Sequence, residues 1–508
     1  MPKQKKNEVD TYKKLKSVLN KPINKGKLSD RINTFELRVR LLKEAYTYID
    51  GNRGTLRGAF KPYNLRDAMK AIQELSNSLD KELEALRSQM VKQQNFANQL
   101  IIKNDTGEYA GNRKFYVNFV NVGLGDCTLI TTPKGKTIML DCGSHALKDV
   151  TSVIPGYNPA ANGPPKQIIG NSIRSKTFLN GNSIIDILVL SHTDADHHNQ
   201  LKDILGTISG MKVNVVYFGG ADTITKYSSS AYIKEIAGTT ESDLKRVDLK
   251  ELPDKDKNGN IVLVKQINGS SITATSGKPN ELGDEFIDPT TGEIVLYYED
   301  DDTSDFRLSV LASNTLGVWV GNNFIKNDAH TDLKASTEMK ENSDEANRTS
   351  LVALAHCFGQ QIIITGDATA VTERFMINNY SKQLATVQTL RIGHHGSPTS
   401  SSEAFVNALT AMERAVASTC GEKTKKYAFP KFHIMDLFRP KLLSDPPAPP
   451  HNIWSWKAEF QNQKVFPEFN QTKAHLFATG SNNSVHLSFE KSKSKPDPDT
   501  IPSLPPTL

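Results

Sequence analysis

The sequence predicts a mixed α/β protein with a helical N-terminal region, on three observations. Short apolar runs typical of buried strands occur through the middle of the chain, and residues 184–190 are the plainest of them. Histidine and aspartate residues follow where such runs end. Residues 31–100 instead carry apolar side chains at helical spacing. A chain of 508 residues is long enough for two to three domains with a large core.

The segment after residues 184–190 is the most informative in the chain. It reads HTDADHH over residues 192–198, so that imidazoles and carboxylates crowd a loop at the end of a predicted strand. Such groups cannot pack together in a dry core without a severe desolvation cost. A divalent metal ion resolves the conflict, because coordinate bonds replace the lost hydration. The alternative is a polar loop that caps a helix, but the crowding of candidate ligands favours the metal.

This segment is similar to the H-x-[HD]-x-D-H signature of the metallo-β-lactamase superfamily, and its aspartate-rich form resembles the hydrolase domain of ComEC-type DNA-uptake proteins. Further segments resemble that branch in the same order, each at a predicted strand end: residues 119–126, 137–143, 347–352, 362–367 and 391–397. The resemblance covers residues 114 to about 440. It implies an αββα sandwich, two mixed sheets between layers of helices. That branch's transmembrane channel has no counterpart here, so a DNA-uptake role is not carried over.

The resemblance also implies two divalent metal ions. Their ligands would be His192 and Asp194 for the first, Asp196, His197 and one of His394 and His395 for the second, with Asp367 bridging both. Two such ions stabilise the attacking and leaving oxygens of a displacement and lower the pKa of bound water to roughly 7, which makes hydroxide available. With this many carboxylates, Mn²⁺ is as plausible as Zn²⁺.

Catalysis is expected to depend most on Asp196 and on the pair His394 and His395, of which one ligates while the other supports it or donates a proton to the leaving group. The sequence departs from the branch at one place. Relatives carry a Y-x-H-P motif, whereas this chain has Phe429 before the proline. Either the assistance of that histidine is missing, or His433 substitutes for it.

Other residues near these motifs have supporting roles in this interpretation. Asp141 is expected to orient a ligand histidine, because metal-bound imidazoles usually donate their other N–H to a carboxylate, and Asp126 is expected to do likewise. Asn347 stands where the wider superfamily supplies a further histidine. Ser397 either contacts phosphate or caps a helix. Gly143 is expected to serve a tight turn.

The chain divides into five predicted regions. They are a basic, flexible arm over 1–30, a helical region over 31–100, a hydrolase domain over 113–440 with an insertion within about 205–345, an appendage over 441–490 and a disordered tail over 491–508. Leu65, Ile72, Leu79 and Leu86 are spaced seven apart in the helical region. That spacing fits an antiparallel hairpin, and equally a coiled coil that joins two copies or a partner protein.

Composition bounds the class of protein. The first thirty residues hold nine Lys against three acidic residues, a surplus of six that equals the net charge of the whole chain. A solvated arm explains this surplus, and a non-specific phosphate-binding tail is the alternative. No apolar run is long enough to cross a bilayer, and the Lys-rich start lacks the apolar core of a signal peptide. The four scattered cysteines indicate free thiols in a reducing, cytoplasmic setting.

These observations predict a metal-dependent hydrolase that cleaves phosphodiester bonds, a nuclease acting on nucleic acid. The fold alone would not justify this prediction, because one fold hosts many chemistries. Its basis is the ligand pattern together with the resemblance. Two alternatives stay open: a hydrolase of a small molecule such as a cyclic nucleotide or a lactone, and a component of a multi-protein system that binds a partner.

Overall fold

The computed structural model divides into two compact units, Met1–Ile101 and Ile102–Leu508. In the first unit the structure describes residues 38, 42, 70, 72–74, 77 and 79, all of them helical, with Leu42 and Leu79 buried. In the second it describes residues 111–145, 150, 152–153, 164–220, 222–238, 243–275, 281–326, 345–423, 428–442, 451–458, 465–472, 474–482 and 484–491. The predicted arm over 1–30 and nearly all of the helical region and the tail lie outside the described residues.

The first large sheet has nine strands in the order β23-β1-β2-β3-β5-β6-β7-β8-β9. Its strands are β1 (Lys114–Phe119), β2 (Thr128–Thr131), β3 (Thr137–Leu140), β5 (Ile184–Leu190), β6 (Lys212–Phe218), β7 (Leu244–Lys255), β8 (Ile261–Ile267), β9 (Ser270–Ser271) and β23 (Val485–Glu490). Strands β3, β5, β6 and β7 run parallel, so their carboxyl ends share one edge. The strand predicted over residues 184–190 is present with those bounds.

The second large sheet has eight strands in the order β10-β11-β12-β15-β16-β17-β18-β22. Its strands are β10 (Phe286–Ile287), β11 (Ile294–Tyr298), β12 (Arg307–Ala312), β15 (Val352–Cys357), β16 (Gln360–Ile364), β17 (Thr389–Ile392), β18 (Arg414–Ala417) and β22 (Leu476–Ala478). Strands β16, β17, β18 and β22 are parallel, and the other neighbours pair antiparallel. The loops that carry the predicted ligands after β16 and β17 therefore leave the same edge.

Shorter elements complete the described part of the second unit. Three two-stranded sheets pair β13 (Val318–Val320) with β14 (Asn323–Ile325), β4 (Ser152–Val153) with β19 (Glu422–Lys423), and β20 (His451–Ala458) with β21 (Val465–Thr472). The helices are α6 (Pro165–Arg174), α7 (Leu201–Leu205), α8 (Ser230–Ile236), α9 (Glu345–Arg348), α10 (Ala370–Leu384), α11 (Glu403–Ala408), α12 (Phe432–Phe438) and α13 (Thr479–Asn482), with single turns η1 (Ala195–His197), η2 (Ile224–Lys226) and η5 (Gly393–Gly396). Among the described helices none is both long and apolar enough to span a membrane.

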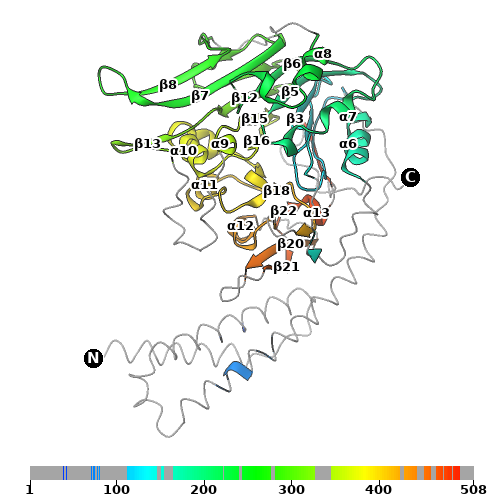
Figure 1. Ribbon diagram of the computed structural model, residues 1–508, viewed down its shortest axis with the longest axis vertical. Coiled ribbons are helices and arrows are strands. Elements are labelled where there is room, and N and C mark those ends of the chain that lie inside the picture. The colour runs from blue at the N-terminus through cyan, green and yellow to red at the C-terminus, as the bar shows by residue number, and fades with distance from the viewer. Residues whose placement is uncertain are drawn as a thin grey trace. The chain divides into compact units, whose positions relative to one another are not determined.

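Two hydrophobic cores hold these layers together. The larger core joins side chains of both sheets, such as Val189 and Leu308, with Phe375 of α10. The smaller core packs the other face of the first sheet, including Leu188, against α6, α7 and α8, as with Ile173 of α6 (Figure 1). The α/β class predicted from the sequence is confirmed as a fold with two large sheets and several helices. Its assignment to the αββα metallo-β-lactamase sandwich stays a prediction.

All four cysteines are free, as predicted, and all four are buried.

Several strands of the large sheets fall outside the core of the predicted hydrolase domain. Strand β22 pairs with β18 and strand β23 pairs with β1 along its whole length, so both lie in the large sheets although they fall within the predicted 441–490 appendage. Strands β6 and β7 of one sheet and β11 and β12 of the other likewise fall within the predicted insertion at 205–345.

Deleting residues 1–101 should leave the second unit folded. That unit contains both large sheets and both hydrophobic cores, which is what a domain needs to fold on its own. We expect the thermal unfolding midpoint to shift by no more than about 4 °C, which corresponds to roughly 1 kcal/mol for a large domain. Differential scanning calorimetry of full-length and truncated protein measures this. A truncated protein that lacks a cooperative transition would contradict the division into two units.

Candidate metal centre

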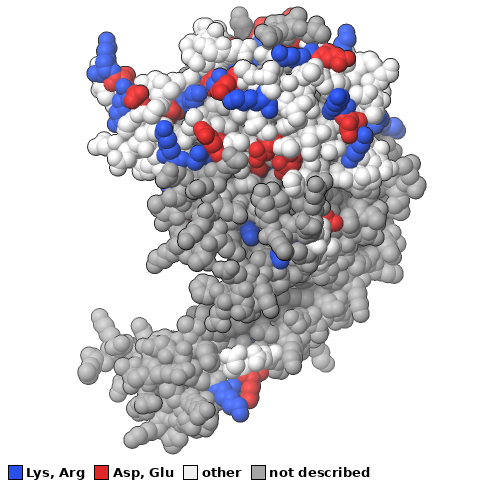
Figure 2. Space-filling model, viewed as in Figure 1, with Lys and Arg blue, Asp and Glu red and all other residues white. Residues whose placement is uncertain are grey.

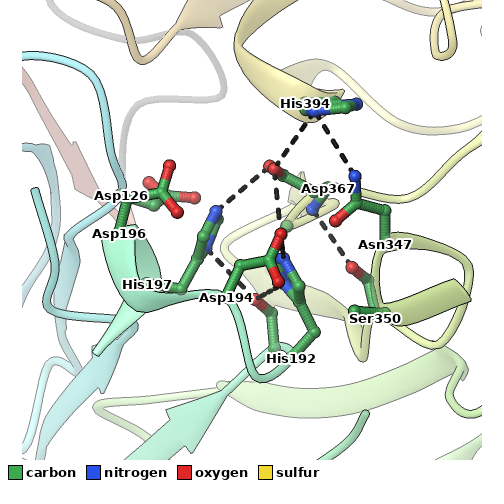
Figure 3. Close-up of polar contacts among 12 residues, drawn as sticks. Asp126, His192, Asp194, Asp196, His197, Asn347, Ser350, Asp367 and His394 are labelled. Carbon is green, nitrogen blue, oxygen red and sulfur yellow. Dashed lines mark hydrogen bonds and ion pairs between the residues drawn. The ribbon is translucent and has the colours of Figure 1, made fainter. Parts of the chain in front are cut away.

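The predicted ligands come from loops at the carboxyl ends of four strands. Asp141 directly follows β3, His192 follows β5, Asp367 follows β16, and the pair His394 and His395 follows β17 within η5. Because the strands within each sheet are parallel here, their carboxyl ends bring these loops to shared edges. Figure 3 shows His192, Asp194, His197 and His394 gathered around Asp367.

His197 is held in a fixed orientation by Asp141. Its Nδ1 lies 2.7 Å from Asp141 Oδ2, and neither side chain is exposed beyond a few per cent. The same carboxylate accepts hydrogen bonds from the backbone N–H and the hydroxyl of Ser191, at 2.7 and 2.6 Å. A carboxylate can only accept, so the His197 proton resides on Nδ1. Nε2 therefore faces the centre, away from Asp141, and the Asp367 and Asp141 carboxylates outweigh burial and raise the pKa of His197.

His192 and His395 are oriented in the same way. The Ser191 hydroxyl donates its hydrogen bond to Asp141, so its oxygen is left to accept from His192 Nδ1 at 3.0 Å. His395 Nδ1 donates to the Ser418 carbonyl at 2.8 Å. Both histidines are buried. In each ring Nε2 is the nitrogen left facing inward without a hydrogen-bond partner, the position from which an imidazole can bind metal.

Asp367 lies at the middle of the histidines. Its Oδ1 is 3.2 Å from His197 Nε2, while its Oδ2 is 3.5 Å from His395 Nε2, 3.7 Å from His394 Nε2 and 4.0 Å from His192 Nε2. The side chain is buried, yet the histidine charges outweigh burial and hold the pKa of Asp367 well below its usual range. An ionised carboxylate at this point can face two cations at once.

The buried donor atoms of this centre fit a divalent metal. His192 Nε2, His197 Nε2, His395 Nε2 and Asp367 Oδ1 are all buried without a hydrogen-bond partner. Leaving such atoms unsatisfied costs about 1–3 kcal/mol each, and coordination would remove that cost. Among the described residues, two overlapping groups of ligand atoms contain the predicted ligands, each within 4.8 Å: His192, His197 and Asp367, and Asp196, His197 and His395; a third group joins Asp126, Asp141 and His197. His197 belongs to both groups, whereas the resemblance assigned it to one ion.

The two aspartates of the 192–198 loop flank these groups. Asp194 Oδ2 lies 3.7 Å from His192 Nε2, and that histidine lowers the Asp194 pKa. Asp196 Oδ2 lies 3.4 Å from His395 Nε2. Burial raises the Asp196 pKa, but the contacts with His395 and His197 outweigh burial and lower it. Both carboxylates are therefore ionised at neutral pH, as metal ligands must be.

His394 is placed differently from His395, and this separates the pair. Its Nδ1 bonds Thr399 Oγ1 at 2.7 Å, and its Nε2 faces the Asn347 amide nitrogen at 3.4 Å. Burial lowers the pKa of His394 to about 4, so the ring is neutral at pH 7. His394 lies in neither ligand group within the described residues, whereas His395 does. Asn347, where the wider superfamily has a histidine, instead borders His394.

Asp126 contacts a cation and not the imidazole that the sequence analysis expected. Its Oδ2 lies 2.8 Å from Arg391 Nη2, and both side chains are buried. Burial raises the Asp126 pKa, and the Arg391 charge offsets only part of that shift. Arg391 also donates to the carbonyls of Gly366 and Ile392 and lies 3.7 Å from Asp367 Oδ1. The sequence analysis missed Arg391, although a charged residue inside the apolar strand β17 was a visible signal.

Ser397 and Phe429 both contact the loop that carries His394. Ser397 is buried and its hydroxyl lies 3.2 Å from Thr399 Oγ1, while the cap of α11 is Ser402. Phe429 takes the place of the motif's histidine and packs its ring 6.0 Å from that of His394. His433 lies exposed on α12. These positions give Ser397 a role in shaping the loop that carries His394.

Replacing Gly143 by alanine should displace the metal-binding loop. A Cβ atom at Gly143 would lie 2.2 Å from the Asp196 carbonyl carbon and 2.5 Å from the His197 nitrogen, so the residue permits a close approach and does not supply the positive φ of a tight turn. We expect a loss of about 1–3 kcal/mol in the free energy of unfolding and at least about tenfold weaker metal binding. Urea denaturation and metal titration measure both quantities.

The matched control is Gly170→Ala in α6, where the added Cβ meets only the flexible end of Arg174. Alanine is the better helix former, so this variant should be as stable as the parent or slightly more so. Unchanged metal affinity in Gly143→Ala would show that the loop does not depend on this contact.

Comparison with known proteins adds little to this geometry. No family model matches the chain, and no curated protein matches it. One similar solved structure is a mutant of the CmlA beta-hydroxylase, with a TM-score of 0.26 and 15% identity over 60% of this chain and 46% of that chain. Another is a diphosphatase from the PhnP family, with a TM-score of 0.25 and 10% identity over 62% of this chain and 89% of that one. The chain therefore spans about half the length of the hydroxylase, at 46%.

Proposed function

We propose that this protein is a metal-dependent hydrolase that cleaves phosphodiester bonds, and that its substrate is nucleic acid. One observation carries the proposal: the buried, unpartnered Nε2 atoms of His192, His197 and His395 converge on the carboxylate of Asp367. The resemblance of the motifs to the ComEC-type branch of the metallo-β-lactamase superfamily supports the choice of reaction.

The residues present would hold two divalent ions, Zn²⁺ or Mn²⁺. We assign His192 and Asp194 to one ion, Asp196, His197 and His395 to the other, and Asp367 to both. Such ions supply Lewis-acid charge at the reacting oxygens and lower the pKa of water to about 7. Three ligand carboxylates against two divalent ions leave one positive charge, which complements the single negative charge of a phosphodiester.

The side chains around the ligands prepare the site for that substrate. Asp141 holds the His197 proton on Nδ1, and Ser418 does the same for His395, so both ligands are ready to bind without rearrangement. His394 remains outside the ligand groups, and 19% of its side chain is exposed. We assign it to contact the substrate, with its Nδ1–H held by Thr399.

Cleavage assays with defined substrates test the proposal. Purified full-length protein, with Mn²⁺ or Zn²⁺ and in parallel with EDTA, is incubated with single- and double-stranded DNA, RNA, cyclic nucleotides and bis(p-nitrophenyl) phosphate. We expect metal-dependent cleavage of bis(p-nitrophenyl) phosphate and of a nucleic acid, the latter weakened by salt because polymer binding releases counterions. Asp196→Asn should be inactive, while Asp203→Asn on α7, also a loss of one acidic charge, should match the parent.

Two results would contradict the proposal in different ways. Cleavage of cyclic nucleotides alone would identify a hydrolase of small molecules. Inactivity toward every phosphodiester, with two metals bound, would mean that the centre serves another reaction.

A further inference from the structure

A segment beside the metal centre is tied directly to the loop that carries His394. The backbone N–H of Lys431 donates to the Gly396 carbonyl at 3.0 Å, and Gly396 ends the turn η5. Two residues earlier, the Phe429 ring packs against His394 at 6.0 Å between centroids. Lys431 is thus anchored to the metal-binding loop through its own backbone and through its neighbour's ring.

Two lysines, one from this segment and one from β20, each place the ammonium group over an aromatic ring. Lys431 Nζ lies 6.0 Å from the centroid of Phe429, and Lys457 Nζ lies 4.6 Å from that of Phe432. A β-bridge between Lys431 and Trp456 holds the two segments side by side. Both lysines are half-buried, so their aliphatic parts pack against neighbouring side chains. The Phe429 ring links Lys431 to the metal-binding loop: its centroid is 6.0 Å from the Lys431 ammonium and 6.0 Å from the centroid of the His394 ring.

The charge around Lys431 is not compensated by an acidic neighbour. Among the residues that the structure describes, Lys431 has no carboxylate within ion-pair distance. Several other described cations are paired: Arg246 and Lys250 share Asp248, and Lys245 pairs with Glu285. On the described part of the face in Figure 2, cations and anions are interspersed in the same manner. An anionic ligand would therefore find an unpaired cation at Lys431, next to the centre.

We propose that Lys431 and Lys457 form a phosphate subsite that binds the backbone of a nucleic-acid strand beside the metal centre. This inference rests on the proposed function and specifies how a polymer is held. When one phosphodiester lies at Asp367, the same strand has to pass over the neighbouring surface, where each further phosphate gains from a cation. A small phosphodiester has no second phosphate to place there.

The double variant Lys431→Gln/Lys457→Gln tests the subsite in the full-length protein with Mn²⁺. Single-stranded DNA and RNA oligonucleotides and bis(p-nitrophenyl) phosphate are the substrates. We expect the KM for an oligonucleotide to rise about tenfold, and the slope of log affinity against log salt to fall by about 1.4, since each lost phosphate contact on a single strand contributes about 0.7. For bis(p-nitrophenyl) phosphate, kcat/KM should stay within about twofold of the parent, because two charges outside the metal centre alter the binding of a small ligand little.

The control removes two lysines elsewhere, with Lys166→Gln/Lys202→Gln on α6 and α7. It changes net charge equally and should leave all three substrates unaffected. An oligonucleotide KM and salt slope that match the parent would overturn the subsite while the proposed function stands. Equal losses on oligonucleotide and small substrate would also overturn it, because they would indicate damage to the metal-binding loop. Parent protein inactive toward both substrates would instead refute the proposed function.

Discussion

Asp367→Asn should abolish hydrolysis and remove at least one metal ion per chain. The substitution keeps the shape of the side chain but replaces a charge that faces four histidine Nε2 atoms, the nearest at 3.2 Å. An amide has one oxygen where the carboxylate has two, so it cannot face both ions, and two divalent charges would be left under-compensated. We expect kcat for bis(p-nitrophenyl) phosphate to fall by about a thousandfold or more. Initial rates and elemental analysis of the same preparation measure both effects.

Asp203→Asn is again the control, because this exposed aspartate of α7 pairs only with Lys166. If Asp367→Asn retained parental turnover with its full metal content, Asp367 would not be the bridging ligand. Loss of turnover with a lowered melting temperature would call for a structural check, which the near-ultraviolet circular dichroism spectrum supplies.

Arg391→Met should destabilise the fold by about 3–5 kcal/mol, the usual cost of leaving one member of a buried ion pair without its partner. Arg391 and Asp126 are both buried, with 2.8 Å between Nη2 and Oδ2. Removing the guanidinium leaves the Asp126 charge in a dry environment and withdraws two hydrogen bonds from backbone carbonyls. Urea denaturation at neutral pH measures the loss. The double variant Arg391→Met/Asp126→Asn should recover a large part of it.

The same pair predicts a dependence on pH. The pKa of Asp126 is already raised by burial, and losing Arg391 raises it further. An acid whose pKa is higher in the folded than in the unfolded state takes up a proton on folding, so its penalty shrinks as pH falls toward the folded pKa. The difference in stability between parent and Arg391→Met should therefore be smaller at pH 5 than at pH 8. A difference that grows on acidification would mean that Asp126 does not carry the effect.

The sequence was informative wherever the signal is local. Strand β5 could be predicted from its apolar run, and the metal-binding role of the 192–198 loop from the candidate ligands crowded within it. Asp141 lies at hydrogen-bond distance from His197, as expected for a residue at the end of a neighbouring strand. Parallel strands place their carboxyl ends together, so residues that follow predicted strands can be expected to meet even when they are far apart in the sequence.

The features that the sequence did not predict depend on how segments far apart in the sequence pack together, and no local pattern indicates that packing. Whether Asp126 meets a histidine or Arg391 depends on the packing of one sheet on the other, and burial of a cation inside β17 is visible only once that packing exists. The role of Gly143 depends on an approach to Asp196 from a separate loop. Strand β23 pairs with β1, which lies almost a whole domain earlier in the sequence, and no local pattern could indicate that pairing. The choice between His394 and His395 required the partners of each ring.

A joint titration of metal and activity tests the central claim most directly. Metal-free protein is titrated with Mn²⁺, and separately with Zn²⁺, while bound metal and cleavage of bis(p-nitrophenyl) phosphate are measured in the same samples. We expect binding to saturate at two ions per chain, activity to reach its maximum only as the second ion binds, and Asp367→Asn to saturate below two and stay inactive. Parent protein that binds no stoichiometric metal, or that cleaves the substrate equally well without metal, would contradict the account.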